Sequence, residues 1–322
     1  MIALSTKFRK ATACVLLDSR TRDEWIEMSD MTDGESESEP LIPRYAVSIT
    51  AFVCAGALAL MALLGPLGTV SIQYRTSQSG IWQTEGGDLV NLLLITPILL
   101  IGGVLHVVRR NSSKYFLILP PITLMYTGLS IGIGQEWSNP SYTGNVEDYF
   151  WLFMILIIGG LILLVASLSM FTVKDTPMFK PRSLRIYVGV MGVFLLIFAA
   201  MWTSELSQVV STGDTSSGSY GDAPTVFWVI RYFDLGVTIP LGFLALFLLL
   251  TKPERSYSMI LLFFGFFITL GTAVNSMGWV MYINEDPEFQ PGSLVIFSVL
   301  GILSYAGLFY LVKDKLRWPS AR

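Results

Sequence analysis

The chain has 322 residues, of which 52% are hydrophobic and 14% are charged, with a formal net charge of −3. An average soluble domain carries about 25% charged residues, so this composition argues against a soluble protein and favours one that lies in a membrane. The single histidine, His106, and the two distant cysteines, Cys14 and Cys54, exclude a His/Cys metal centre.

Residues 1–44 precede the first apolar segment and are predicted to form a tail. Within them, MSDMTDGESESEP is acidic, small and polar, which predicts disorder. The upstream stretch MIALSTKFRKATACVLLDSR has a short apolar core and lacks a convincing small-residue cleavage site, so it does not read as a signal peptide. It is either an ordinary part of the tail or an extension upstream of a true start at Met28 or Met31.

Eight apolar blocks follow, and each has about the 20 residues that a helix needs to cross a bilayer. They cover residues 46–66, 89–108, 115–134, 150–172, 186–204, 228–250, 258–281 and 294–312. Only helices and closed barrels satisfy the backbone inside lipid, and the strand alternation of a barrel is absent. The predicted fold is therefore all-α: a polytopic transmembrane helical bundle of eight spans in a lipid bilayer.

The charges between the blocks predict how the chain is oriented. With eight spans, all of the 21 basic residues except Arg75 and Arg231 fall on one side, which the positive-inside rule assigns to the cytoplasm. The opposite loops are acidic, and most tryptophans lie near that boundary, as an aromatic belt does. Both termini are thus predicted to be cytoplasmic, in the plasma membrane of a prokaryote. Because topology explains the basic residues, no nucleic-acid partner is expected.

Two similar segments indicate an internal duplication. GGDLVNLLLITP (86–97) opens the second span and YFDLGVTIP (232–240) opens the sixth, and both place Asp-Leu at the outer edge before a Thr and a Pro. Loop lengths repeat as well, so spans one to four match spans five to eight. This predicts a parallel 4+4 repeat. The predicted parts are a first half (45–173), a cytoplasmic linker (174–185), a second half (186–313) and a tail (314–322).

Charged and amide side chains at the outer edge form the candidate site. Arg231 and Asp234 are three residues apart and so share a helix face. Two interpretations stay open: the charges lie at the headgroups, or they lie in the outer third of the membrane, where a charge usually faces a cavity. In the second case Asp88, Asn91 and Asn275 lie at similar depth, and the five residues surround one net-negative vestibule. Such a site suits a small cation, a proton relay or an amine-bearing ligand.

No motif indicates an enzyme. GLSIG (128–132) matches a nucleophile elbow, but it lies within a predicted membrane helix far from the only histidine. Its Gly-x-x-x-Gly spacing indicates close helix packing instead. The sequence lacks a Walker A motif, HExxH, and a GxGxxG that follows a strand. We therefore expect a protein that is not an enzyme and that needs no cofactor or metal ion.

The segments WQTEGGDLVNLLLITPILLIGG (82–103) and FDLGVTIPLGFLALFLL (233–249) resemble a broadly distributed family of prokaryotic polytopic membrane proteins with no assigned function. The resemblance covers these segments only; it implies a plasma-membrane protein and supplies no catalytic residues. Two functions are carried forward. One is a transporter or channel-like protein with an outward-facing acidic site. The other is a non-transporting sensor or membrane partner, whose acidic extracytoplasmic loops bind another membrane protein.

Overall fold

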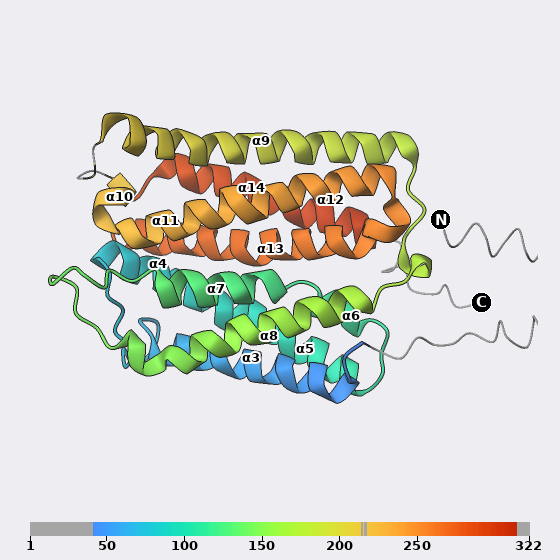
Figure 1. Ribbon diagram of the computed structural model, residues 1–322, viewed down its shortest axis with the longest axis horizontal. Helices are drawn as coiled ribbons and strands as arrows, with labels where there is room; N and C mark the ends of the chain where they lie inside the picture. The colour runs from blue at the N-terminus through green and yellow to red at the C-terminus, as the bar shows by residue number, and fades with distance from the viewer. Residues whose placement is uncertain (1–40, 214, 216–217, 314–322) are drawn as a thin grey trace, which may run out of the picture. The chain divides into compact units, whose positions relative to one another are not determined.

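The computed structural model, shown in Figure 1, describes residues 41–213, 215 and 218–313. The predicted tails, with the alternative starts Met28 and Met31, lie outside the described residues except for the short stretch that leads into the first helix. The described residues from Ile42 onward form one compact unit. Its secondary structure consists of helices, with no strand among the described residues.

Eight helices are long and apolar enough to cross a membrane, which confirms the predicted all-α bundle of eight spans. The spans are α3 (Arg44–Leu64); α4 (Gln78–Val90), η1 (Asn91–Ile95) and α5 (Thr96–Val107); α6 (Ser113–Leu117) and α7 (Pro121–Ile133); η2 (Val146–Tyr149) and α8 (Phe150–Ser169); α9 (Pro181–Thr212); α11 (Pro224–Phe233), η4 (Asp234–Thr238) and α12 (Ile239–Thr251); α13 (Pro253–Ile283); and α14 (Pro291–Val312). The short helices η3 (Val173–Asp175) and α10 (Gly218–Asp222) lie in connections.

Several helices extend beyond the predicted apolar blocks. The second span begins at Gln78 rather than at residue 89, and the fifth runs from Pro181 to Thr212 rather than over 186–204. Apolar composition marks the part of a helix that suits lipid, whereas backbone hydrogen bonds decide where the helix ends. Asp88 therefore lies inside a helix, and not in front of one.

The first four spans and the last four have the same pattern of neighbouring helices (Figure 1). In the first group, α3 packs against α5 and α8, and α7 packs against α8. In the second group, α9 packs against α12 and α14, and α13 packs against α14. Between the groups, α4 packs along α13, while α7 contacts α11 and α13. Two copies of one four-helix unit would make these contacts, but the duplication itself stays a prediction.

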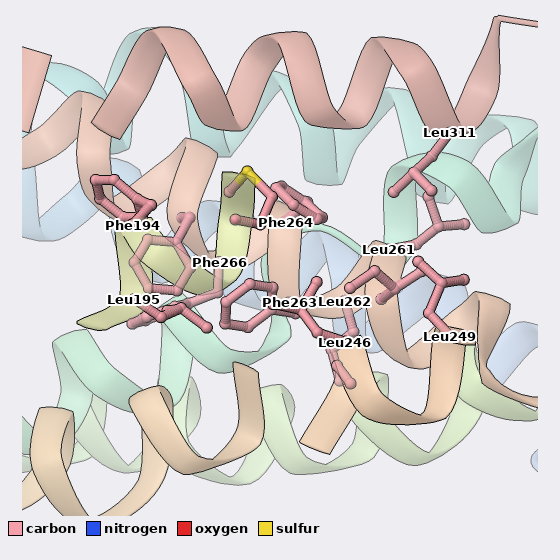
Figure 2. Packing of buried hydrophobic residues seen from close by; sticks show 14 of the residues in the cluster. Phe194, Leu195, Leu246, Leu249, Leu261, Leu262, Phe263, Phe264, Phe266 and Leu311 are labelled. Atoms are coloured by element: carbon pink, nitrogen blue, oxygen red, sulfur yellow. The ribbon is translucent and has the colours of Figure 1, made fainter. Parts of the chain in front are cut away.

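Helix α13 lies at the centre of the protein. Of its most apolar stretch, 72% is buried inside the protein, a larger share than in the other spans. Figure 2 shows Phe263, Phe264 and Phe266 of α13 among the leucines of its neighbours, such as Leu246 of α12 and Leu195 of α9. This phenylalanine-rich core fixes the helix against which the candidate site is built.

Helices α7 and α13 approach each other closely where the two groups meet. The hydroxyl oxygens of Thr123 and Thr269 are 2.5 Å apart, and both side chains are buried. Just before α7, a Cβ added at Gly265 would lie 2.4 Å from Leu119 Cα, so only glycine lets α13 pass this close to the connection between α6 and α7.

The Gly-x-x-x-Gly prediction is confirmed on the other side of α7. A Cβ at Gly128 would lie 2.9 Å from Phe153 O, and one at Gly132 would lie 3.2 Å from Phe153 Cβ. The two glycines thus let α8 pack closely against α7.

Two π-helical segments interrupt the second and sixth spans at matching positions. Segment η1 ends two residues before Pro97, and η4 ends two residues before Pro240. A proline cannot donate to the carbonyl four residues earlier, which favours an irregular turn at this point. The offset is 143 residues for both features (91 to 234, and 97 to 240). At this offset Asn91 corresponds to Asp234, whereas the expected pairing of Asp88 with Asp234 requires an offset of 146 residues.

Candidate functional site

A cavity of about 350 Å³ lies between the two groups of four spans. Its walls come from α4, α7, α9, α11, α13 and the start of α14. Exposed Glu288 and Gln290, in the connection before α14, lie at one end, whereas buried Thr123 lies deep between the spans. The cavity is therefore reached from the end of the bundle that holds the acidic loops, which we call the acid-rich end (the connections at 65–77, 134–145, 213–223 and 284–290).

Aromatic rings form much of the cavity wall. They are Tyr74, Tyr126, Phe198, Trp202, Phe227, Phe266, Phe267, Phe289 and Phe297. Such rings offer a large apolar surface, and their faces attract cations. The wall is thus suited to an organic ligand, and to a positively charged one in particular.

The charged side chains of the lining are mostly acidic. They are Glu205, Asp222, Asp234 and Glu288, with Arg231 as the one basic residue that the lining contains. The formal charge of the lining is therefore negative, as expected for a site that holds a cation.

Arg231 is held by α9 and by aromatic rings. It is 5% exposed and forms an ion pair with Glu205. Its guanidinium lies 3.7 Å from the ring centroid of Phe227 and 4.5 Å from that of Trp202. Glu205 was not among the predicted site residues, because the predicted fifth span ended one residue before it, while the helix continues to Thr212. Trp202 and Glu205 are three residues apart and so share a helix face, and this spacing was the signal in the sequence that could have identified Glu205.

Asp234 is the acidic residue deepest in the wall. It is 2% exposed and begins the π-helical segment η4. Thr238 Oγ1 donates to its Oδ1 at 3.1 Å. A carboxylate can accept about four hydrogen bonds, so Asp234 keeps acceptor capacity for a ligand. Its side chain is enclosed by protein and lines the cavity, while its depth in the membrane stays a prediction.

The structure brings together three of the five predicted site residues. Asn91, Arg231 and Asp234 line the cavity, whereas Asp88 and Asn275 lie outside its lining. Asn275 connects α13 to α14, because its Nδ2 donates to Phe297 O at 2.9 Å and its Oδ1 accepts from Ser298 at 2.6 Å. Asp88 is fully buried, and its Oδ2 lies beside Gly65 at the end of α3. The five residues therefore do not surround one vestibule, as was predicted.

Side chains also connect the two groups of spans around the acid-rich end. The contacts are Ser77 Oγ to Asp222 Oδ2 at 2.6 Å, Ser79 Oγ to Asp286 Oδ2 at 2.7 Å, and Thr225 N and Oγ1 to Glu136 at 2.8 and 3.1 Å. Glu136 is 4% exposed and Asp286 is 5% exposed. Two acids of the predicted loops are thus used inside the protein, and are withdrawn from the surface that a partner protein would meet.

Comparisons of the chain with protein-family models, with curated proteins and with solved structures found no match. The resemblance to prokaryotic polytopic membrane proteins therefore stays a prediction. Within the described residues, no group of three or more His, Cys, Asp or Glu side chains is placed to hold a metal ion.

Proposed function

We propose that this multi-pass membrane protein binds an amine-bearing organic cation in the cavity, as the first step of its transport. The observation that supports this most is the buried carboxylate of Asp234 in a wall of aromatic rings. An ammonium group there would form a charge-assisted hydrogen bond with Asp234 and cation–π contacts with the rings. The volume, about 350 Å³, falls within the usual range of small-molecule pockets.

Transport rather than sensing is favoured by the backbone of the two spans that carry polar residues into the cavity. Both η1 and η4 interrupt the regular helix where Asn91 and Asp234 face the ligand space. Interrupted helices often build substrate sites in secondary transporters, since they leave backbone groups for the ligand and bend when the site changes access.

The alternative is a sensor or membrane partner that uses its acidic extracytoplasmic loops to bind another protein. The burial of Glu136 and Asp286 weakens it, because these acids serve contacts inside the protein. The transport proposal includes the predicted orientation of the chain. In that orientation the acid-rich end, and with it the cavity mouth, lies outside a prokaryotic cell, and both termini lie in the cytoplasm.

The test is a binding titration of the full chain in detergent with alkylammonium ions of increasing size, read by tryptophan fluorescence. Asp234→Asn removes the charge and is expected to weaken binding about 10–100-fold, the range for losing a hydrogen bond to a charged group. Asp148→Asn is the matched control, because Asp148 is exposed and lies outside the cavity lining. Equal affinity of wild type and Asp234→Asn would contradict the proposal. Accumulation of the bound amine in proteoliposomes would then separate transport from sensing.

A further inference from the structure

Asp88 is a buried carboxylate that lies outside the cavity lining. Its side chain is fully buried, and the amide of Asn91 is the one nearby donor; neither carboxylate oxygen accepts a hydrogen bond of good geometry from the described residues. A buried carboxylate without donors is strongly disfavoured, and burial is tolerated when a positive charge lies beside it. A group with these needs is a candidate ligand for a cation.

Oxygen atoms from three segments meet at Gly65, directly after α3. The position that a Cβ on Gly65 would occupy lies 2.7 Å from Met61 O, 2.8 Å from Asp88 Oδ2 and 3.7 Å from Tyr74 Oη. Apart from Gly65 itself and its two neighbours in the chain, these are the three nearest heavy atoms to that point, and all are oxygens. The absence of a side chain at Gly65 therefore leaves a small space with oxygen atoms around it.

Tyr74 supplies a second unused polar group to the same space. Its side chain is 4% exposed, and its hydroxyl has no hydrogen-bond partner among the described residues. Met61 O belongs to the last turn of α3, where the carbonyl end of the helix carries partial negative charge. Carboxylate, hydroxyl and carbonyl oxygens are the ligands that hard cations prefer.

We propose that Asp88, the Tyr74 hydroxyl and the Met61 carbonyl form a binding site for one sodium-sized monovalent cation. One carboxylate balances a single positive charge, whereas a divalent ion would leave a net charge buried in the membrane. Tyr74 and Asn91, which is one turn from Asp88, also line the cavity, so the two sites share a wall. The inference does not depend on the proposed function, because Asp88 and Met61 lie outside the cavity lining, and Tyr74 would contribute its hydroxyl to the cation site and only its ring to the cavity wall.

The test is thermal unfolding of the full chain in detergent, in NaCl and in N-methylglucamine chloride at equal ionic strength. Sodium at ten times its Kd is expected to raise Tm by about 3 °C. Potassium at the same concentration should raise it less. Asp88→Asn should abolish the sodium-dependent shift, and Asp234→Asn, which alters the cavity only, should keep it. Direct binding of ²²Na⁺ to the wild type should approach one ion per chain.

Two further variants keep the test decisive if Asp88→Asn does not fold. Tyr74→Phe removes one ligand and should weaken the sodium response, and Gly65→Ala fills the space and should eliminate it. Equal shifts with sodium and N-methylglucamine would overturn the proposal. A shift that survives in the Asp88, Tyr74 and Gly65 variants would also overturn it. So would a stability that depends on pH through Asp88 but not on sodium, since a proton alone would then occupy the site.

Discussion

Lys114 and Asp175 form a buried ion pair away from the cavity, at the basic end of the bundle. Lys114 Nζ lies 2.6 Å from Asp175 Oδ1, and the other oxygen accepts from Thr172 N at 2.8 Å and from Thr172 Oγ1 at 3.1 Å. Burial raises the pKa of Asp175, but the hydrogen bonds from Lys114 and Thr172 together outweigh it, so the pKa lies below its ordinary value. The pair holds the connection after α8 against the start of the third span.

This pair predicts a loss of stability in acid. Because the folded pKa of Asp175 is below the unfolded value of about 3.9, its contribution is complete above roughly pH 4. That contribution disappears as the pH falls through the folded pKa. Asp175→Asn should lower stability at pH 7 by about 2 kcal/mol and reduce the further loss between pH 4 and pH 2. Thermal unfolding across this range measures both effects.

The exposed Asp148 gives the control for this prediction. Asp148→Asn should leave the stability at pH 7 close to that of the wild type. An acid profile of Asp175→Asn that is identical to the wild type would show that the ion pair does not contribute.

Single residues also show where sequence reasoning reaches its limit. Asp88 and Asp234 each precede a leucine and were expected to be equivalent, yet one lies beside Gly65 and the other lines the cavity. The direction of a side chain depends on the helix register, and the π turns at Asn91 and Asp234 set that register. An Asp-Leu pair in the sequence does not reveal a π turn. It therefore predicts where the Asp lies along the span, but not the direction in which its side chain points.

At the scale of elements, the contact of α4 with α13 depends on glycine. A Cβ at Gly86 would lie 2.5 Å from Met277 Cα and 2.6 Å from Met277 N, both of them backbone atoms. Backbone cannot move aside as a flexible side chain can, so a methyl group there would push the two helices apart. The α4–α13 contact forms one wall of the cavity, and its spacing thus affects the ligand site.

Gly86→Ala is therefore expected to destabilise the protein by about 1–3 kcal/mol, the usual cost of overpacking. Gly192→Ala in α9 is the matched control, because a Cβ there meets nothing within 4 Å. That control should be neutral or stabilising by up to about 1 kcal/mol, since alanine favours the helix. Tm values of the two variants in detergent give the comparison, and a Gly86→Ala variant as stable as Gly192→Ala would rule out the close contact.

The number and order of the helices followed from composition, but several of their ends did not. Blocks of apolar residues predicted each span, because lipid selects for them. Glu205 and Gln78 lie in polar extensions of the fifth and second spans, beyond the apolar stretches by which a span is recognised in the sequence. These extensions build much of the cavity mouth, and hydropathy cannot detect them.

For the whole molecule, the predicted orientation places the acid-rich end outside the cell. Ser141 and Ser112 are exposed residues in connections at opposite ends of the bundle. In a background without native cysteines, an impermeant thiol reagent should label Ser141→Cys on intact cells. It should label Ser112→Cys only after the membrane is opened. The reverse pattern would place the cavity mouth in the cytoplasm and would exclude uptake from outside as its role.

The pairing of α4 with α13 also has a consequence for how the protein is made. Gly86 contacts Met277, which is synthesised 191 residues later (86 to 277). At ribosomal rates of about 5–20 residues per second, α4 waits about 10–40 s for this neighbour. During that interval the face of α4 that carries Gly86 has no α13 to cover it. The insertion machinery must therefore cover this face of the second span until the seventh span has been inserted. A chain whose synthesis stops between the two spans would expose this face to membrane proteases.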